Sequence, residues 1–115
     1  MVITNTTSIK YLKTIGIVNN GFNGRGFANP YDVAIGPGDN IFVLNRCDPA
    51  RRNAIRVGVC NLDEEYLYEF GYGFGDGDGQ MMLPVAMAFD AEGRLLITDE
   101  HTNRITIYSD EGEVL

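Results

Sequence analysis

An internal repeat constrains this sequence more than any other feature. The segments Pro30–Val43 (PYDVAIGPGDNIFV) and Pro84–Ile97 (PVAMAFDAEGRLLI) lie 54 positions apart and follow the same plan. Each begins with a proline, continues with alternating apolar residues, turns at a glycine and ends in three apolar residues. A chain with two such copies is expected to fold as two similar supersecondary units.

Two shorter matches extend the repeat. Asn53–Val57 matches Asn103–Ile107 at a distance of 50 positions, so we expect the first copy to hold four extra residues within Cys47–Arg52. Tyr11–Gly16 matches Tyr66–Gly71 at a distance of 55 positions. The segment near the N-terminus therefore resembles the last strand of the first copy.

The hydrophobic pattern has a period of two, which is typical of β-strands, and no stretch shows an apolar helical stripe. Each apolar run ends after a few residues at Gly, Asp, Asn or Pro. We expect strands at 9–15, 31–36, 40–45, 54–60, 65–70, 85–90, 94–98, 104–109 and 112–115. Each copy is then four antiparallel strands followed by a glycine-rich crossover such as 71–80, which is the plan of a β-propeller blade.

The residues of the second copy resemble the NHL repeat, a propeller family. The resemblance is carried by Gly77-Asp78-Gly79-Gln80 before a proline, by Asp90 and Gly93, and by Asp99 followed by Asn103-Arg104-Ile105. The copy at 77–115 fits best. The copy at 24–70 departs from the pattern, with Gly36, Asn45 and Ala54 in place of Asp90, Asp99 and Arg104. The resemblance implies an all-β propeller and leaves the activity open.

A propeller needs roughly 4–8 blades, so two blades are expected to assemble with further copies. Since NHL-like propellers most often have six blades, the resemblance implies a homotrimer. We expect 1–115 to be one two-blade unit, with the first blade at 24–70 and the second at 77–115. The strand at 9–16 is expected to be donated to a neighbouring blade. Rings of two or four chains, and a chain cut from a longer gene, stay open.

Composition excludes several classes of partner. Nine basic residues against 16 acidic ones give a net charge of -7, which argues against nucleic acid and anionic membranes as partners. No apolar run is long enough to span a membrane, and residues 1–10 show no secretory signal. Cys47 and Cys60 are expected to lie too far apart for a disulfide, and free thiols favour a cytoplasmic location.

Candidate ligand-binding residues lie in the loops at 19–29, 45–53, 71–83 and 99–103, which a propeller gathers on one face. Arginine presents a planar fork of donors to carboxylates or phosphates, and an aromatic ring can line a groove. The candidates are Arg46, Arg51, Arg52, Tyr72 and His101. The plainer alternatives are that the arginines pair with nearby acids and that the rings pack between blades.

The pattern favours a non-catalytic binding scaffold, without a cofactor, for a peptide, a protein or a small polar ligand. The alternative is a metal-assisted enzyme of the propeller lyase or lactonase kind. Calcium or zinc would then be held near the ring axis by Asp99, Glu100 and His101. Asp99 occupies a repeat position, where its expected role is hydrogen bonding to loop backbone. A third interpretation is a gene fragment that folds without a selected function.

Overall fold

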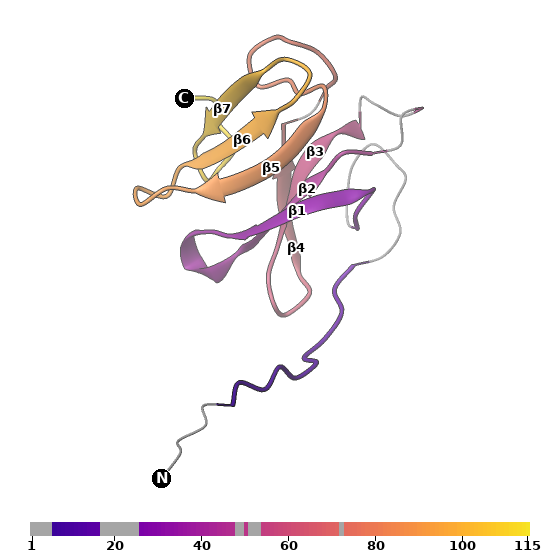
Figure 1. Ribbon diagram of the computed structural model, residues 1–115, viewed down its shortest axis with the longest axis vertical. Helices are drawn as coiled ribbons and strands as arrows, with labels where there is room; N and C mark the ends of the chain where they lie inside the picture. Colours follow the sequence, from indigo (N-terminus) through magenta and orange to yellow (C-terminus); the bar gives the residue numbers. More distant parts are fainter. Residues whose placement is uncertain (1–5, 17–25, 48–49, 51–53, 72) are drawn as a thin grey trace.

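The alternating runs form two antiparallel β-sheets in a computed structural model, which describes residues 6–16, 26–47, 50, 54–71 and 73–115. The first sheet has the order β1-β2-β3-β4 and the second the order β5-β6-β7 (Figure 1). The strands are β1 (Pro30–Ile35), β2 (Ile41–Asn45), β3 (Arg56–Cys60), β4 (Tyr66–Phe70), β5 (Pro84–Phe89), β6 (Leu95–Asp99) and β7 (Arg104–Tyr108). The short 3-10 turn η1 (Pro37–Asp39) joins β1 to β2. The expected all-β fold is confirmed.

The first turn of each sheet is built in the same way. Gly36 donates to the carbonyl of Asn40 at 2.9 Å, and Asp90 donates to the carbonyl of Arg94 at 3.0 Å. Gly93 has a φ of 79°, a left-handed conformation that glycine adopts without a steric cost. These turns set the register of β1 with β2 and of β5 with β6.

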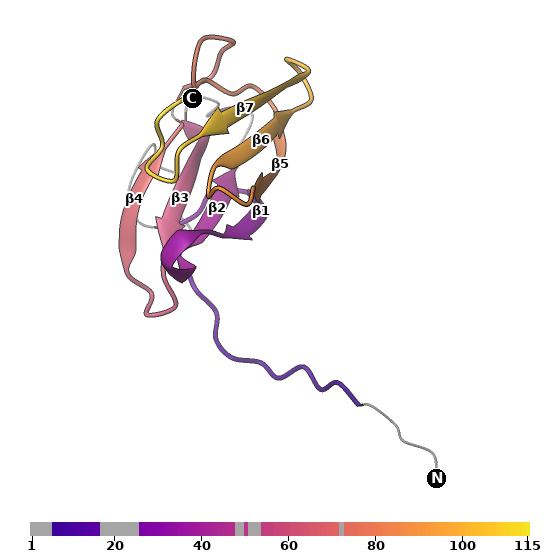
Figure 2. The same ribbon diagram turned by 90° about the vertical axis from the view of Figure 1, so that its left-hand side faces the viewer.

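The seven strands expected between residues 31 and 109 are confirmed, with small shifts at their ends. The two strands expected at 9–15 and 112–115 are not strands in this structure. Residues 6–16 have no sheet partner and lead away from both sheets (Figures 1 and 2). Near the C-terminus, Val114 forms only an isolated bridge with Tyr108, and Leu115 donates to the carbonyl of Ile107 at 2.9 Å.

Strand pairing corrects the alignment of the two copies. Asn45 pairs with Arg56 in the first sheet, and Asp99 pairs with Arg104 in the second. Arg56 therefore corresponds to Arg104, 48 positions later, and the expected distance of 50 positions is wrong. Because β2 and β6 correspond at 54 positions, the loop after β2 is six residues longer than the loop after β6, where four were expected.

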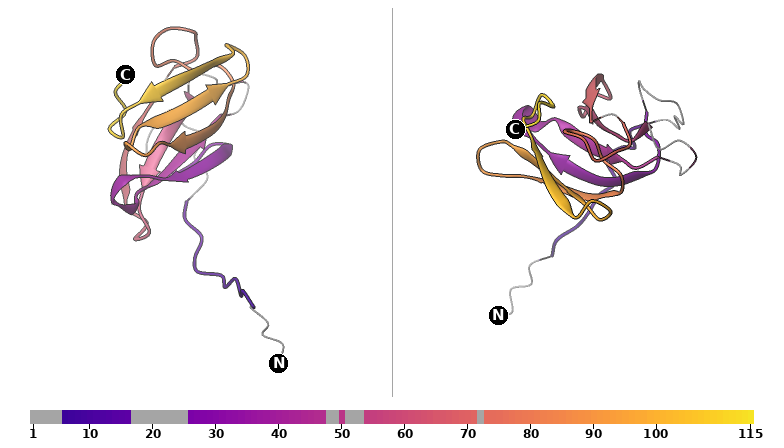
Figure 3. Two further views of the ribbon diagram at one scale, coloured as in Figure 1. Left: turned by 60° about the vertical axis from the view of Figure 1, so that its left-hand side comes forward. Right: turned by 90° about the horizontal axis from the view of Figure 1, so that it is seen from above.

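The second sheet lies over one face of the first, with β5 beside β1 (Figure 2). Figure 3 shows the same stacking from two other sides. Between the sheets, the ring of Phe42 meets that of Phe89 edge to face, with 4.8 Å between centroids. The main-chain N–H of Met87 donates to Asp32 across the same seam at 2.7 Å. We call this contact between the two sheets the internal seam.

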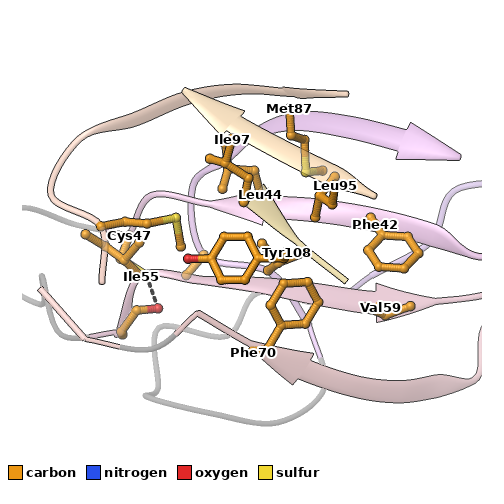
Figure 4. Packing of buried hydrophobic residues seen from close by; sticks show 14 residues of the cluster. Phe42, Leu44, Cys47, Ile55, Val59, Phe70, Met87, Leu95, Ile97 and Tyr108 are labelled. Atoms are coloured by element: carbon orange, nitrogen blue, oxygen red, sulfur yellow. Dashed lines mark hydrogen bonds between the residues drawn. The ribbon is translucent and has the colours of Figure 1, made fainter. Parts of the chain in front are cut away.

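The core fills the internal seam (Figure 4). Tyr108 is buried there, its ring lies 5.4 Å from that of Phe70, and its hydroxyl donates to the carbonyl of Gly79 at 3.0 Å. Burial raises the pKa of Tyr108 to about 12. Buried side chains of the cluster include Phe42, Leu44, Val57, Val59, Phe70, Met81, Met87, Leu95, Ile97 and Tyr108.

We expect Phe42→Ala to lower the free energy of unfolding by about 3–5 kcal/mol, because it opens a cavity where four aromatic rings meet. Urea denaturation followed by circular dichroism measures this. Leu62→Ala is the control: its side chain is 51% exposed, so the change should stay within about 0.5 kcal/mol. Equal effects of the two substitutions would contradict the core assignment.

Candidate functional site on the loop face

Two corresponding chain segments leave the sheets at one end of the molecule. Arg46 and Cys47 follow β2, and Glu100 and His101 follow β6. The main-chain N–H of Arg46 donates to the carbonyl of Asn29 at 3.1 Å, and that of Glu100 donates to Leu83 at 3.0 Å. These matching bonds make Arg46 and Glu100 equivalent positions of the repeat. We call this end of the molecule the loop face.

Asp99 organises the backbone of the loop face. One carboxylate oxygen accepts the N–H groups of Met82 and Leu83 at 2.7 and 3.1 Å, and the other accepts those of His101 and Thr102, both at 3.0 Å. Burial acts to raise the pKa of the Asp99 carboxyl. The four N–H donors outweigh it, so the pKa lies below its ordinary value.

Asn45 has the corresponding role in the first sheet. Its side-chain oxygen accepts the N–H of Ala28 at 2.9 Å, as Asp99 accepts that of Met82. Asn45 therefore keeps one of the four acceptor roles that Asp99 performs, and its amide nitrogen donates to the carbonyl of Val43 at 3.1 Å. The expected structural role of Asp99 is what these hydrogen bonds perform.

Arg46 joins the two sheets on the loop face. Its Nη2 donates to Oε1 of Glu100 at 2.5 Å, and its guanidinium lies 4.5 Å from the centre of the Tyr31 ring. Burial acts to lower the pKa of Arg46, but the hydrogen bonds to Glu100 and Tyr31 raise it. Since the Arg46 side chain is 16% exposed and that of Glu100 55%, the pair lies at the rim of the internal seam.

Two hollows open on the loop face and share Met82. The first, of about 500 Å³, lies between His101, Arg104 and the segment Gly75–Asp76. The second, of about 450 Å³, lies between Tyr31, Arg46 and Leu83. We call these two neighbouring hollows together the groove; their lining combines the apolar side chains of Met82 and Leu83 with the cationic side chains of Arg46 and Arg104.

The structure places two of the five candidate ligand-binding residues in this groove. Arg46 lines one hollow and His101 lines the other. The other three candidates, Arg51, Arg52 and Tyr72, lie outside the described residues. Sequence reasoning did not select Tyr31, Met82 and Arg104 for the groove. Arg104 stands in the repeat signature, and Tyr31 and Met82 are not among the sequence candidates.

The metal-site alternative gains no support from the described residues. Both oxygens of Asp99 already accept two backbone donors each, and Glu100 pairs with Arg46. Within the described ranges, no three His, Cys, Asp or Glu side chains gather into a possible metal site. The lyase or lactonase interpretation stays a prediction.

Cys47 is part of the loop structure. Its thiol is buried and donates to the carbonyl of Ala54 at 2.6 Å. Burial raises the pKa of the thiol, although Arg56 acts in the opposite direction. Cys60 pairs with Ile41 at the far end of the hairpin and is also free, so the expected absence of a disulfide between the two is confirmed.

We expect Asp99→Ala to lower the free energy of unfolding at pH 7 by about 1–3 kcal/mol, because four backbone donors lose their acceptor. Asp99→Asn should cost less, since Asn45 shows that an amide oxygen can serve this corner. Urea denaturation of the three chains at pH 7 checks the order. A larger loss for the Asn variant would contradict the assigned role.

The same carboxylate predicts a pH dependence. Its folded pKa is depressed, so its contribution is fully present above the unfolded pKa of about 3.9 and is lost as pH falls through the folded value. The wild-type chain should therefore lose more stability than Asp99→Asn when the pH drops from about 6 to below 3. Equal losses of thermal stability in the wild-type and Asp99→Asn chains over this pH range would show that Asp99 does not titrate this way.

No protein-family model matches this sequence, and a search of curated proteins finds no significant match. No helix in the described part of the chain is long and apolar enough to cross a membrane. The NHL-like resemblance thus rests on the repeat residues themselves. What is shown is an all-β chain of two antiparallel sheets, with four and three strands.

Proposed function

We propose that this chain assembles head to tail into a closed six-bladed propeller of three copies, and that the ring is a non-catalytic binding scaffold. The observation that carries the proposal is that the second sheet, and strand β1 of the first sheet, leave exposed the side that the corresponding strands of the other sheet bury in the internal seam. The first sheet packs with the side of Phe42 and Leu44, and the second with the side of Leu95 and Ile97. The opposite side of the second sheet is open and apolar. The opposite side of the first sheet is open at β1, whereas at β2 and β3 it is buried within the chain.

The open face of the second sheet corresponds to the buried face of the first. Leu96 and Ile105 stand at the repeat positions of Phe42 and Val57. Phe42 and Val57 are fully buried, whereas Ile105 is 61% exposed. The open-face side chains of the second sheet are Ala86, Ala88, Leu96, Thr98, Ile105 and Ile107.

Along β1, the first sheet is open on the side that the second sheet buries along β5. Val33 and Ile35, exposed by 58% and 61%, stand at the repeat positions of Met87 and Phe89. The face of the second sheet that bears Ile105 can therefore pack on the side of β1 that bears Val33 in another copy, as the two sheets pack within one chain. This contact is head-to-tail and closes by rotation. Covering both faces also removes apolar patches that a lone chain would leave in water.

The N-terminal segment supports strand donation between copies. Gly16 and Gly71 both have a positive φ, 118° and 80°. A Cβ at Gly16 would meet Phe27, and one at Gly71 would meet Met81, so both glycines lie against the residue that precedes the next sheet. Gly16 thus leads into the first sheet as Gly71 leads into the second.

By this correspondence, 9–16 matches the outer strand β4. Ile9 and Tyr11 of this segment are 96% and 82% exposed. The second sheet offers the outer edge of β7, where Ile107 accepts only one described bond from the incipient fourth strand, donated by Leu115. An extended segment added to such an edge gains backbone hydrogen bonds and buries its apolar side chains.

The groove of the loop face supports a binding role. It joins the apolar side chain of Met82 to Arg46, His101 and Arg104, a combination that suits a peptide or a small polar ligand. Asp99 and the Arg46–Glu100 pair fix its walls. Three copies would place three such grooves around one axis.

We expect the chain to have a mass near three times 12.7 kDa in light scattering on a sizing column. Ile105→Asp should yield a folded species of a single chain, because it places a carboxylate on the open face that the partner covers. Leu62→Asp is the matched control, since this exposed side chain lies in the turn between β3 and β4. A wild-type monomer, or a trimer of the Ile105→Asp chain, would overturn the assembly.

Deleting residues 1–16 should weaken the trimer by at least about tenfold in dissociation constant, because the donated strand is lost. Deleting residues 1–8 is the control, since it keeps Ile9 and Tyr11. Sedimentation equilibrium compares both with the full chain. Equal dissociation constants for the two deletions would show that 9–16 is not exchanged.

A further inference from the structure

The ion pair of the loop face carries an inference about how copies recognise one another. Arg46 and Glu100 follow corresponding strands, and their main-chain N–H groups donate to corresponding carbonyls. In the internal seam, the Arg46 position of the first sheet therefore faces the Glu100 position of the second. The pair bridges two equivalent positions of adjacent sheets.

In the proposed contact between two copies, which we call the seam between copies, the same geometry exchanges the positions of the two charges. In the contact between two copies, the second sheet of one chain takes the place that the first sheet has in the internal seam. Glu100 then occupies the position that Arg46 has in the internal seam. The first sheet of the partner subunit presents its Arg46 where Glu100 stood. The two residues that face each other between copies again have opposite charges.

We infer that Glu100 pairs with Arg46 of the partner subunit as well as with its own Arg46, so that the loop face of the ring carries a closed series of alternating charges. This inference rests on the proposed assembly and names the contact that selects its partner, a second copy of this chain. The side chain of Glu100 is 55% exposed in a single chain and so is accessible to a second cation. Arg46 has five N–H donors, more than one carboxylate engages.

Net charge makes such pairs useful. Each copy carries -7, so copies repel one another at long range. Opposite charges at the rim of each seam offset this repulsion. They also disfavour contacts between two first sheets or two second sheets, because equivalent positions would then set like charges together.

The test mixes two charge-reversed chains. Arg46→Glu and Glu100→Arg each place like charges at every seam, within and between copies, whereas the double variant restores opposite charges at all of them. When the two single variants are mixed, opposite charges return only where unlike chains meet. Mixing therefore reports the contact between copies and leaves the internal pair broken.

Native mass spectrometry counts the rings of each composition. Random assortment makes mixed rings about three times as frequent as uniform ones. We expect the ratio of mixed rings to uniform rings to exceed this random value by about fivefold or more, because every mixed ring gains two seams of opposite charge. The double variant should form rings as the wild-type chain does.

The outcomes separate the two proposals. Wild-type rings together with a random ratio in the mixture would overturn this inference and leave the assembly standing. A wild-type chain that remains a monomer would overturn both.

Salt dependence decides the question if the single variants do not fold. With the pairs in place, raising the salt from about 0.05 to about 0.5 M should weaken the wild-type trimer by several-fold. Without them, salt would screen the repulsion between acidic copies and strengthen the trimer. The double variant Arg46→Gln/Glu100→Gln lacks both charges, so its trimer should become stronger as the salt concentration rises. A wild-type trimer that strengthens with salt would contradict the inference.

Discussion

The internal seam is the contact on which the rest of the structure depends. Two sheets that are each too thin to enclose a core pack face to face, and aromatic rings from β2, β4, β5 and β7 meet between them. The loop face follows from this stacking, because the seam brings Arg46 to Glu100 and sets Met82 between the two hollows. Whatever the groove binds, its walls are held by the packing beneath it.

The departure of the first copy from the repeat pattern at Gly36 has a physical reason in this seam, and strand pairing places Arg56, not Ala54, at the position of Arg104. A Cβ at Gly36 would come within 2.6 Å of the Phe42 ring and 2.7 Å of the Phe89 ring, so a residue like Asp90 does not fit there. At Asp90 the carboxylate instead accepts the N–H groups of Glu92 and Arg94, both at 2.9 Å. The rings of Phe42 and Phe89, which meet beside this turn, therefore account for the glycine.

Much of the fold could be predicted from the sequence, because local rules fix it. Period-two runs and glycine turns located the seven strands, and the repeat position of Asp99 indicated its hydrogen bonds. The alignment of Asn53–Val57 with Asn103–Ile107 failed because similar residues recur two positions apart in a strand, and only pairing fixes the register.

The site was less predictable. The partners Arg46 and Glu100 lie 54 positions apart in the sequence, and Tyr31 reaches Arg46 only once the strands are paired. No local pattern encodes which loop residues a seam between sheets will bring together. Candidates chosen by residue type therefore included Arg46 and His101 but not Met82, whose importance is purely positional.

The central claim is that one packing mode joins the sheets within a chain and between chains, and a thiol cross-link tests it most directly. The contact of Phe42 with Phe89 would recur between copies as Leu96 with Ile35 of the partner subunit. Within one chain these two positions lie on opposite outer faces. A chain carrying Ile35→Cys and Leu96→Cys, treated with a short bifunctional thiol reagent, should run on a denaturing gel as a covalent trimer. Every chain in this test also carries Cys47→Ala and Cys60→Ala, because both native thiols are free and Cys60 lies in the same cross-strand row as Ile35. Each single variant should remain a monomer. Monomers alone from the double variant, at a concentration where wild-type rings would form, would contradict the account.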